Sequence, residues 1–198
     1  KTSKGELIFP GYAFGGETGY TVMRGGTAPG ALQWDSFRYL GHQDANWDWK
    51  NFNIDTDTAL AKKNAGFIDS VDPDLSKFKA HGGKLILYHG WADPAIQPEH
   101  TVNYYSSVLS KMGKSQENWM GLFMVPGMGH CGGGSGPNQI DWIGTLETWR
   151  EKGTAPAAIV GSGTNAGTPM TRPLCPHPQV ATYKGTGNVN DAASFACK

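Results

Sequence analysis

An aspartate and a histidine each follow a short apolar run, and their side chains have the chemistry of an acid and a base that work together. Asp93 ends the segment KLILYHGWAD, which begins at Lys84. His130 lies near the end of LFMVPGMGHC, which begins at Leu122. In each segment four apolar residues run into a glycine-containing turn, which is typical of a buried parallel strand followed by a loop. The pattern therefore predicts two strand ends, each followed by one ionisable side chain.

The stretch between the two predicted strands is expected to be a helix. From Glu99 to Met112 the apolar residues recur with helical spacing. A strand–helix–strand unit makes the two strands parallel and places both loops at the carboxyl edge of one sheet, where open α/β sheets carry their sites. An acid followed along the chain by a histidine corresponds to the last two members of the Ser–Asp–His triad of α/β-hydrolases.

The serine that this triad requires is missing from the sequence. No Gly-x-Ser-x-Gly motif occurs in the 198 residues, and that motif presents the nucleophile in α/β-hydrolases. Ser135 and Ser162 lie in glycine-rich stretches, but both follow His130 and so come in the wrong order. The sequence is therefore interpreted as a part of an enzyme that holds the acid and the base.

Other roles for these side chains compete with the triad. Asp93 precedes a proline and could be a turn residue, while His130 could be a loop histidine bound by backbone groups. His89 is interpreted as a buried structural histidine at the tip of the first strand. A zinc site of His89, Asp93, His130 and Cys131 is disfavoured because no usual ligand spacing occurs. The acids between residues 44 and 57 lack the spacing of a calcium loop, so no metal site is predicted.

The composition argues against two classes of partner. Seventeen acidic and 17 basic residues give a formal net charge of zero, so neither nucleic acid nor a membrane surface is indicated as a partner. The longest apolar runs are strand-sized and too short for a membrane-spanning helix. The sequence starts at Lys1 with no methionine and no signal peptide, from which upstream processing or truncation is expected.

Three cysteines leave one without a partner inside the chain. Cys175 and Cys197 both lie in a tail that is rich in proline and glycine and has little periodicity. A bridge between them would close a loop of about 20 residues and contribute about 3 kcal/mol to stability. Such a bridge favours an oxidising compartment and therefore secretion. Cys131 is then the unpaired cysteine.

The rest of the chain predicts loops and a few short elements. Residues 1 to about 55 are rich in glycine and aromatic side chains, and form either a satellite core or a lid that faces substrate. Residues 155–161 are expected to form a final edge strand. Helices are expected over residues 55–65, 74–81 and 138–152. The buried face of the last helix is expected to carry Ile140, Ile143, Leu146 and Trp149.

Several segments of the chain carry a family resemblance. In chain order they are GYAFGGETGY, KLILYHGWADPAIQP, YYSSV, FMVPGMGHCGGGSGP, LETWREKGTAP, RPLCPHPQVATYKGTG and AASFAC. These segments resemble the tannase and feruloyl esterase family, which also contains the bacterial enzyme that hydrolyses mono(2-hydroxyethyl) terephthalate. The segments PGMGHC and RPLCP are specific to this family.

The resemblance implies an α/β fold in two parts. Residues 73–198 would be the C-terminal part of an α/β-hydrolase catalytic domain, and residues 1–72 the distal part of an inserted lid domain. Asp93 matches the triad acid and His130 the base. The nucleophilic serine in a Cys–Ser pair, the oxyanion hole and a calcium loop of the lid are expected in an N-terminal portion or chain outside these residues. No cofactor is expected in this chain itself.

The resemblance also assigns roles to the cysteines and to part of a substrate pocket. Cys131 matches a cysteine that is disulfide-bonded to the Cys–Ser pair, and Cys175 and Cys197 match the pair that holds the C-terminal tail. The expected substrate is an ester of an aromatic acid, namely ferulic acid, gallic acid or a terephthalate monoester, and the expected location is outside the cell or in the periplasm. The acyl pocket is expected to include Ile96, Pro98 and Met128.

A function of another class also fits the sequence. A secreted module could keep the hydrolase scaffold without its serine and bind a phenolic or carbohydrate ligand through its aromatic side chains. A disulfide-linked partner that carries a Cys–Ser pair would distinguish the enzyme from this binding module.

Overall fold

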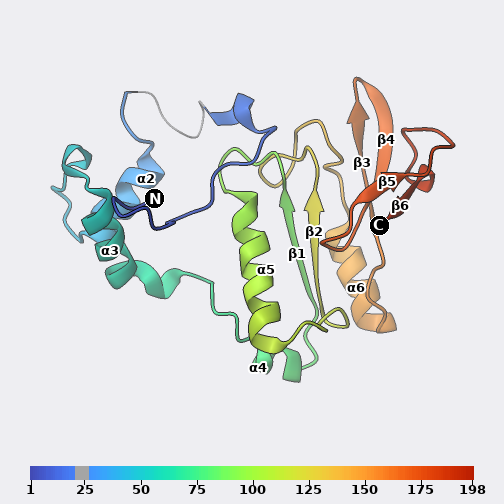
Figure 1. Ribbon diagram of the computed structural model, residues 1–198, viewed down its shortest axis with the longest axis horizontal. Helices are drawn as coiled ribbons and strands as arrows, with labels where there is room; N and C mark the ends of the chain where they lie inside the picture. The colour runs from blue at the N-terminus through green and yellow to red at the C-terminus, as the bar shows by residue number, and fades with distance from the viewer. Residues whose placement is uncertain (21–26) are drawn as a thin grey trace. The chain divides into compact units, whose positions relative to one another are not determined.

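The computed structural model describes residues 1–20 and 27–198 (Figure 1). Residues 21–26, which fall within the predicted lid portion, lie outside the described residues. Contacts along the chain divide it into two compact units. The first comprises Lys1–Pro10 and Thr18–Val71, and the second comprises Gly11–Glu17 and Asp72–Lys198. Residues 11–17 therefore belong with the second unit, although they precede most of the first unit in the sequence.

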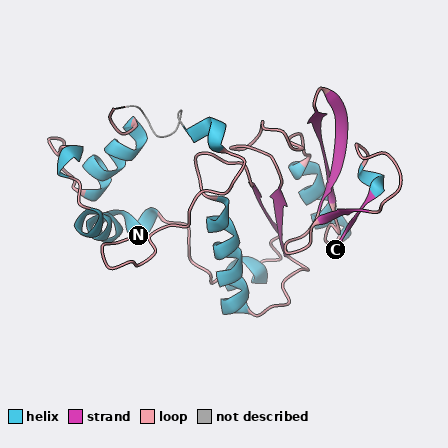
Figure 2. Ribbon diagram, turned by 45° about the horizontal axis from the view of Figure 1, so that its top comes forward, coloured by secondary structure: helices cyan, strands magenta, loops and turns pink. Residues whose placement is uncertain are grey.

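Two parallel strands form the centre of the second unit. β1 (Leu85–Gly90) and β2 (Met120–Val125) pair in parallel over their whole length. They are connected by α5 (Pro98–Met112). Figures 1 and 2 show α5 on one side of the strand pair and α6 (Trp142–Lys152) on the other. The predicted strand–helix–strand unit is confirmed.

Each face of the strand pair has its own hydrophobic core, because successive side chains of a strand point to opposite faces. The core cluster on the α5 face contains Tyr105, Val108, Trp119, Met120, Leu122 and Met124. The cluster on the opposite face contains Phe123, Val125, Met128, Ile159 and Leu174. Burial on both faces explains why each strand is a continuous apolar run in the sequence.

β1 is less buried than β2, and the edges of the two strands differ. Within the described residues β1 pairs only with β2, so its other edge carries no strand. The outer edge of β2 is covered, because the His177 amide donates to the Leu122 carbonyl at 2.7 Å. The prediction that both strands are fully buried therefore holds for β2, while β1 is half-buried within the described residues.

α5 covers one face of the strand pair. Pro98 stands in its first turn, where a missing N–H group costs no helical hydrogen bond. The helix ends before Gly113, whose φ of 92° favours glycine. The predicted apolar face of the helix is confirmed. Its residues in or against the core cluster are Val102, Tyr105, Val108, Leu109 and Met112.

α6 begins four residues later than predicted. Asp141 caps the helix, and its carboxylate accepts a hydrogen bond from the Gly144 amide at 2.8 Å. Trp142 packs against the core cluster and Trp149 is 1% exposed, whereas Ile143, which was expected to be buried, is 68% exposed. The predicted buried face was therefore wrong at Ile143. The predicted stop at Gly153 is confirmed, since the helix ends there with a φ of 71°.

The C-terminal region contains more sheet than the sequence indicates. β3 (Ile159–Asn165) and β4 (Thr168–Leu174) form an antiparallel hairpin. β5 (Ala181–Tyr183) pairs with β6 (Phe195–Cys197). The predicted final strand at 155–161 is therefore the start of a hairpin. The expected disulfide is confirmed: Cys175, next to the end of β4, is bonded to Cys197 in β6.

Short helices complete the second unit. α4 (Ser76–Ala80) lies inside the predicted helix at 74–81 and precedes β1. A 3-10 turn, η5 (Ala192–Ser194), precedes β6. A further 3-10 turn, η1 (Glu17–Gly19), lies where the chain passes from the second unit to the first.

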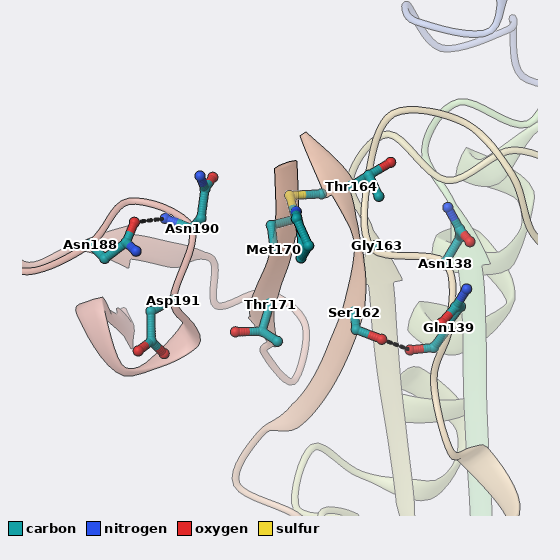
Figure 3. Close-up of a pocket in the computed structure, with 11 residues that line it drawn as sticks. Asn138, Gln139, Ser162, Gly163, Thr164, Met170, Thr171, Asn188, Asn190 and Asp191 are labelled. Atoms are coloured by element: carbon teal, nitrogen blue, oxygen red, sulfur yellow. Dashed lines mark hydrogen bonds between the residues drawn. The ribbon is translucent and has the colours of Figure 1, made fainter. Parts of the chain in front are cut away.

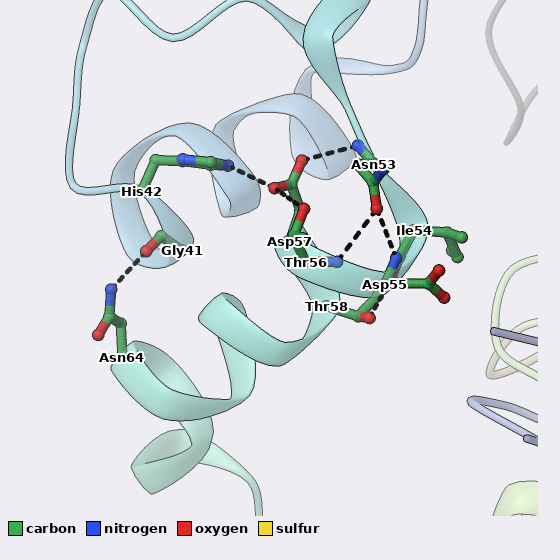
Figure 4. Close-up of polar contacts among 9 residues, drawn as sticks. All are labelled: Gly41, His42, Asn53, Ile54, Asp55, Thr56, Asp57, Thr58 and Asn64. Atoms are coloured by element: carbon green, nitrogen blue, oxygen red, sulfur yellow. Dashed lines mark hydrogen bonds and ion pairs between the residues drawn. The ribbon is translucent and has the colours of Figure 1, made fainter. Parts of the chain in front are cut away.

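The described part of the first unit is helical. Its longest helix, α3 (Ile54–Ala65), matches the prediction to within one residue at its start. Figure 4 shows that start: the Asn53 side chain accepts hydrogen bonds from the amides of Asp55 and Thr56, and buried Asp57 lies 3.4 Å from His42. The shorter helical elements are α2 (Ala31–Asp35), the π-helical η2 (Ser36–Gly41), and the 3-10 turns η3 (Trp49–Asn51) and η4 (Gly66–Ile68).

The aromatic side chains of the first unit pack against one another. Trp34 contacts Trp47 and Trp49 with ring centroids 6.1 Å apart in each pair, and Phe37 meets Phe52 at 4.9 Å. They line a cavity of about 430 Å³ within this unit. These contacts give the aromatic-rich segment a core of its own, as the satellite-core interpretation expects.

Candidate active site

Backbone hydrogen bonds join the loops that follow β1 and β2. The Trp91 amide donates to the Val125 carbonyl at 2.9 Å, and the Ala92 amide donates to the Met128 carbonyl at 3.0 Å. Both loops leave the carboxyl ends of neighbouring parallel strands, so they start side by side. This pairing brings Asp93, at the end of one loop, to His130, at the end of the other.

Asp93 is buried and accepts a hydrogen bond from His130. The distance from its Oδ2 to Nδ1 of His130 is 2.8 Å, within the range expected for a carboxylate that orients a catalytic imidazole. Its other oxygen, Oδ1, accepts from the amides of Ala95 and Ile96 at 2.7 and 3.0 Å. The carboxylate is thereby held in one orientation although only 2% of the residue is exposed.

These hydrogen bonds decide the ionisation of Asp93. Burial raises the pKa of this carboxyl, but hydrogen bonds from the Ile96 amide, His130 and the Ala95 amide, together with the charge of His130, lower it. Their combined effect is larger, and the pKa lies below its ordinary value of 3.8. Asp93 is therefore a carboxylate at neutral pH.

The ionised carboxylate determines the tautomer of His130. A carboxylate only accepts hydrogen bonds, so Nδ1 of His130 carries the hydrogen and Nε2 of the neutral ring keeps its lone pair. The His130 side chain is 54% exposed, in contrast to the 3% of its Asp93 partner. The arrangement is that of a general base: one nitrogen is held by a buried acid, and the other is free to take a proton from a group at the surface.

A second histidine, His89, contacts the same carboxylate. Its Nε2 lies 3.1 Å from Oδ2 of Asp93, and its Nδ1 lies 2.7 Å from the Thr101 hydroxyl on α5. Sequence reasoning treated His89 as a structural histidine and missed this contact. The available signal was its position four residues before the acid, on the same strand end.

Residues 11–17 also approach the acid loop. A β-carbon on Gly16 would lie 2.7 Å from the Ala92 carbonyl oxygen, so the backbones meet too closely for a side chain there. The GGET sequence was recognised as part of a resemblance, but its packing against the Asp93 loop was not predicted.

Cys131 directly follows His130, is exposed and forms no disulfide within the described chain. Its φ of 58° lies in the left-handed region that residues with side chains rarely adopt. The expectation that Cys131 is the unpaired cysteine of this chain is met, and its bond to a further cysteine stays a prediction.

The three residues expected in an acyl pocket differ in exposure. Ile96 is 48% exposed, and its backbone amide donates to the Asp93 carboxylate. Pro98 is fully buried at the start of α5, and Met128 is 1% exposed and packs with Phe123 and Val125. A pocket role remains a prediction for Ile96, while the burial of Pro98 and Met128 gives no support for contact with a substrate.

A serine hydroxyl is not hydrogen-bonded to His130 anywhere in the described residues. Ser162 instead donates to the Gln139 carbonyl at 3.4 Å (Figure 3). This pair borders a cavity of about 640 Å³ between residues 138–139, the β3–β4 hairpin and residues 188–191. Neither Asp93 nor His130 lines that cavity, so it is separate from the acid–base pair.

Residues 1–20 and 27–198 hold no group of three or more His, Cys, Asp or Glu side chains that could bind a metal ion. They also include no helix with the length and apolar character needed to span a membrane.

Comparison with known proteins finds similar sequences among ester hydrolases. The chain is 44% identical over 135 residues to mono(2-hydroxyethyl) terephthalate hydrolase from Piscinibacter sakaiensis, covering 65% of this chain and 22% of that protein. It is 33% identical to feruloyl esterase C from Talaromyces stipitatus, covering 98% of this chain and 41% of that protein.

Solved structures give the same result. The structure of feruloyl esterase B from Aspergillus oryzae superposes with a TM-score of 0.90 at 26% identity, covering all of this chain and 43% of that one. The fold is accordingly that of an α/β-hydrolase-like portion, and the chain spans less than half the length of these relatives. A sequence model of tannase and feruloyl esterase matches residues 15–198, and the chain belongs to the tannase and feruloyl esterase family.

Proposed function

We propose that this chain supplies the acid and the base of a secreted serine esterase that hydrolyses esters of aromatic acids. The observation that carries the proposal is the 2.8 Å hydrogen bond between buried Asp93 and half-exposed His130. The names of its relatives, which include a feruloyl esterase and a terephthalate-ester hydrolase, support the same reaction class.

The reaction follows from the tautomer of His130. Its Nε2 takes the proton of a serine hydroxyl while the serine oxygen attacks the ester carbonyl, and Asp93 stabilises the resulting imidazolium. His130 then gives this proton to the departing alcohol as the acyl–serine ester forms. A water molecule attacks that ester in a second round of the same proton transfers, which releases the acid and restores the serine.

We place the nucleophilic serine in an N-terminal portion or chain that carries a Cys–Ser pair. Three observations support this placement. His130 has no serine partner within the described residues, the outer edge of β1 lacks a strand there, and Cys131 is exposed and unpaired beside the base. In this proposal further strands continue the sheet from β1, and a disulfide from Cys131 holds the serine loop against the histidine loop.

The substrate proposal is an ester whose acyl group is aromatic: a hydroxycinnamoyl, galloyl or terephthaloyl group. Ile96 is the described residue best placed to contact it, since its side chain is half-exposed and its amide binds the triad acid. Residues 1–72 are proposed to be the distal part of a lid domain. The chemistry requires no cofactor in this chain, and a calcium ion is proposed for the lid portion outside it on the family resemblance alone.

The proposal also places the protein outside the cytoplasm, in the extracellular space or the periplasm. The disulfide between Cys175 and Cys197 supports this location because such bonds persist in oxidising compartments.

Hydrolysis assays on the complete protein test the proposal. Methyl ferulate, methyl gallate and mono(2-hydroxyethyl) terephthalate would be compared as substrates, with His130→Ala as the test variant and exposed His81→Ala as the control. We expect His130→Ala to lower kcat by at least about a thousandfold and His81→Ala to leave it unchanged. The 198-residue chain alone should hydrolyse none of the three esters. Binding of these esters without hydrolysis by the complete protein would favour the non-catalytic module instead.

A further inference from the structure

One oxygen of Asp93 is shared by two imidazole rings. Oδ2 lies 2.8 Å from Nδ1 of His130 and 3.1 Å from Nε2 of His89. His89 lies at the end of β1 and His130 in the loop after β2, yet both rings contact this one buried atom. His130 is half-exposed, whereas the His89 side chain is only 13% exposed. The His130 ring is therefore accessible to solvent, whereas the His89 ring is largely buried.

The hydrogen bonds define the protonation of His89. Because Oδ2 of the ionised carboxylate only accepts, Nε2 of His89 carries a hydrogen. In the neutral ring Nδ1 then keeps a lone pair, which accepts the hydroxyl hydrogen of Thr101 at 2.7 Å. The Thr101 hydroxyl, which can donate as well as accept, fits this tautomer and holds the other side of the ring.

We propose that His89, held in place by Thr101, is a positioning residue for the acid–base pair, a role that rests on the proposed esterase function. It does not touch the reacting atoms. It donates the second hydrogen bond to Oδ2 and so limits both the rotation of the carboxylate and the strength with which that oxygen attracts the proton of His130.

The second donor has a definite effect on the base. A carboxylate oxygen that already accepts one hydrogen bond has less negative charge available for another partner. Removing the His89 donor therefore strengthens the attraction between Asp93 and the protonated form of His130. Since His130 must be neutral to act as a base, the acidic limb of the kcat/KM profile moves to higher pH.

The contacts of His89 link it to the base through one atom. Its ring nitrogens contact Asp93, in the loop after β1, and Thr101 on α5. On the other side of the carboxylate, His130 of the β2 loop contacts the same oxygen. The predicted pH shift is therefore assigned to the shared oxygen.

Four variants of the complete protein test the role. His89→Phe fills similar space but donates nothing, while His89→Gln keeps an amide donor. Thr101→Val removes the hydroxyl with little change of shape, and Thr101→Ser keeps it. We expect His89→Phe to lower kcat roughly tenfold with KM unchanged, and to move the acidic limb to higher pH. Thr101→Val should give a smaller change in the same direction, and His89→Gln and Thr101→Ser should restore most of the activity.

A double variant separates positioning from general stability. If Thr101 acts through His89, adding Thr101→Val to His89→Phe should lower kcat no further than His89→Phe alone. A merely structural role would lower the midpoint of unfolding but leave the pH profile of the folded enzyme unchanged, and that result would overturn the proposal. If His89→Phe does not fold, Thr101→Val alone carries the same pH test.

A measurement that does not depend on catalysis tests the role of His89 separately from the proposed esterase function. Nitrogen chemical shifts of the imidazole rings at neutral pH report which nitrogen carries hydrogen. We expect hydrogen on Nε2 of His89 and on Nδ1 of His130. Hydrogen on Nδ1 alone in His89 would refute the shared oxygen even in an active esterase. A complete protein that shows the expected tautomers but no ester hydrolysis would refute the proposed function instead.

Discussion

Gly90, the last residue of β1, packs directly against the backbone of Met128 in the histidine loop. A β-carbon on Gly90 would overlap the Met128 carbonyl oxygen and lie 2.6 Å from the Gly129 carbonyl oxygen. We therefore expect Gly90→Ala to push the loop that carries His130 away from the acid loop. The expected loss in unfolding free energy is about 1–3 kcal/mol, measured by urea unfolding.

A glycine in the same loop serves as the control for this variant. A β-carbon on Gly132 would meet no atom within 4 Å, so Gly132→Ala should change the unfolding free energy by less than about 0.5 kcal/mol. Equal stability of the two alanine variants would contradict the close packing at Gly90.

The lowered pKa of Asp93 predicts how stability depends on pH. A carboxyl whose pKa is lower in the folded than in the unfolded chain stabilises the fold at pH values above its unfolded pKa. This contribution is lost as the pH falls from about 4 through the lower folded pKa, since the ordinary value is 3.8. We expect Asp93→Asn to have a lower unfolding free energy than the wild type at neutral pH. The difference between the two unfolding free energies should become smaller below about pH 4.

Urea unfolding at a series of pH values measures this difference in unfolding free energy, with exposed Asp69→Asn as a control for the change in net charge. A difference that stays constant from neutral to acidic pH would show that the charge of Asp93 does not stabilise the fold.

The disulfide between Cys175 and Cys197 joins residues 22 positions apart. Replacing both with serine should lower the unfolding free energy by about 3 kcal/mol, because the unfolded chain regains the freedom of that loop. Unfolding would be measured without reductant, with Cys131→Ser as the control, since this cysteine forms no bond within the described chain. A double variant as stable as the control would contradict the stabilising role of the bridge.

Under the proposed function, Cys131 controls the alignment of base and nucleophile. Cys131→Ala in the complete protein should leave the Asp93–His130 bond in place but lower kcat by about a hundredfold, because a shift of about 1 Å between reacting groups has a cost of that order. Intact-mass measurements with and without reductant should show the Cys131 disulfide in the wild type only. Full activity of the alanine variant would refute the proposal that this disulfide aligns base and nucleophile.

The elements whose apolar residues follow a regular pattern were predictable from the sequence. Four-residue apolar runs located β1 and β2, and helical spacing located α5, so the meeting of Asp93 and His130 followed from the order of the elements. The partnership of His89 was not predictable. It depends on the path of the turn from Gly90 to Asp93, which the composition of that turn does not specify.

The C-terminal elements were missed for a different reason. Pro169 and Pro173 lie inside β4, and proline is usually absent from strand interiors. Pairing with β3 and packing of Leu174 in the core outweigh this local preference. The start of α6 was misplaced because the cap at Asp141 competes with the earlier polar residue Asn138, and only the carboxylate bond to the Gly144 amide decides between them.

The backbone of Cys131 has a consequence for anyone who would engineer this protein. Its φ of 58° suits glycine better than any residue with a side chain, and glycines occupy the next three positions. Selection of this chain for heat resistance alone would therefore favour Cys131→Gly, with a gain of about 1 kcal/mol. Such a variant would lose the thiol that the proposed enzyme needs. A variant library designed for thermal stability should therefore keep Cys131 unchanged.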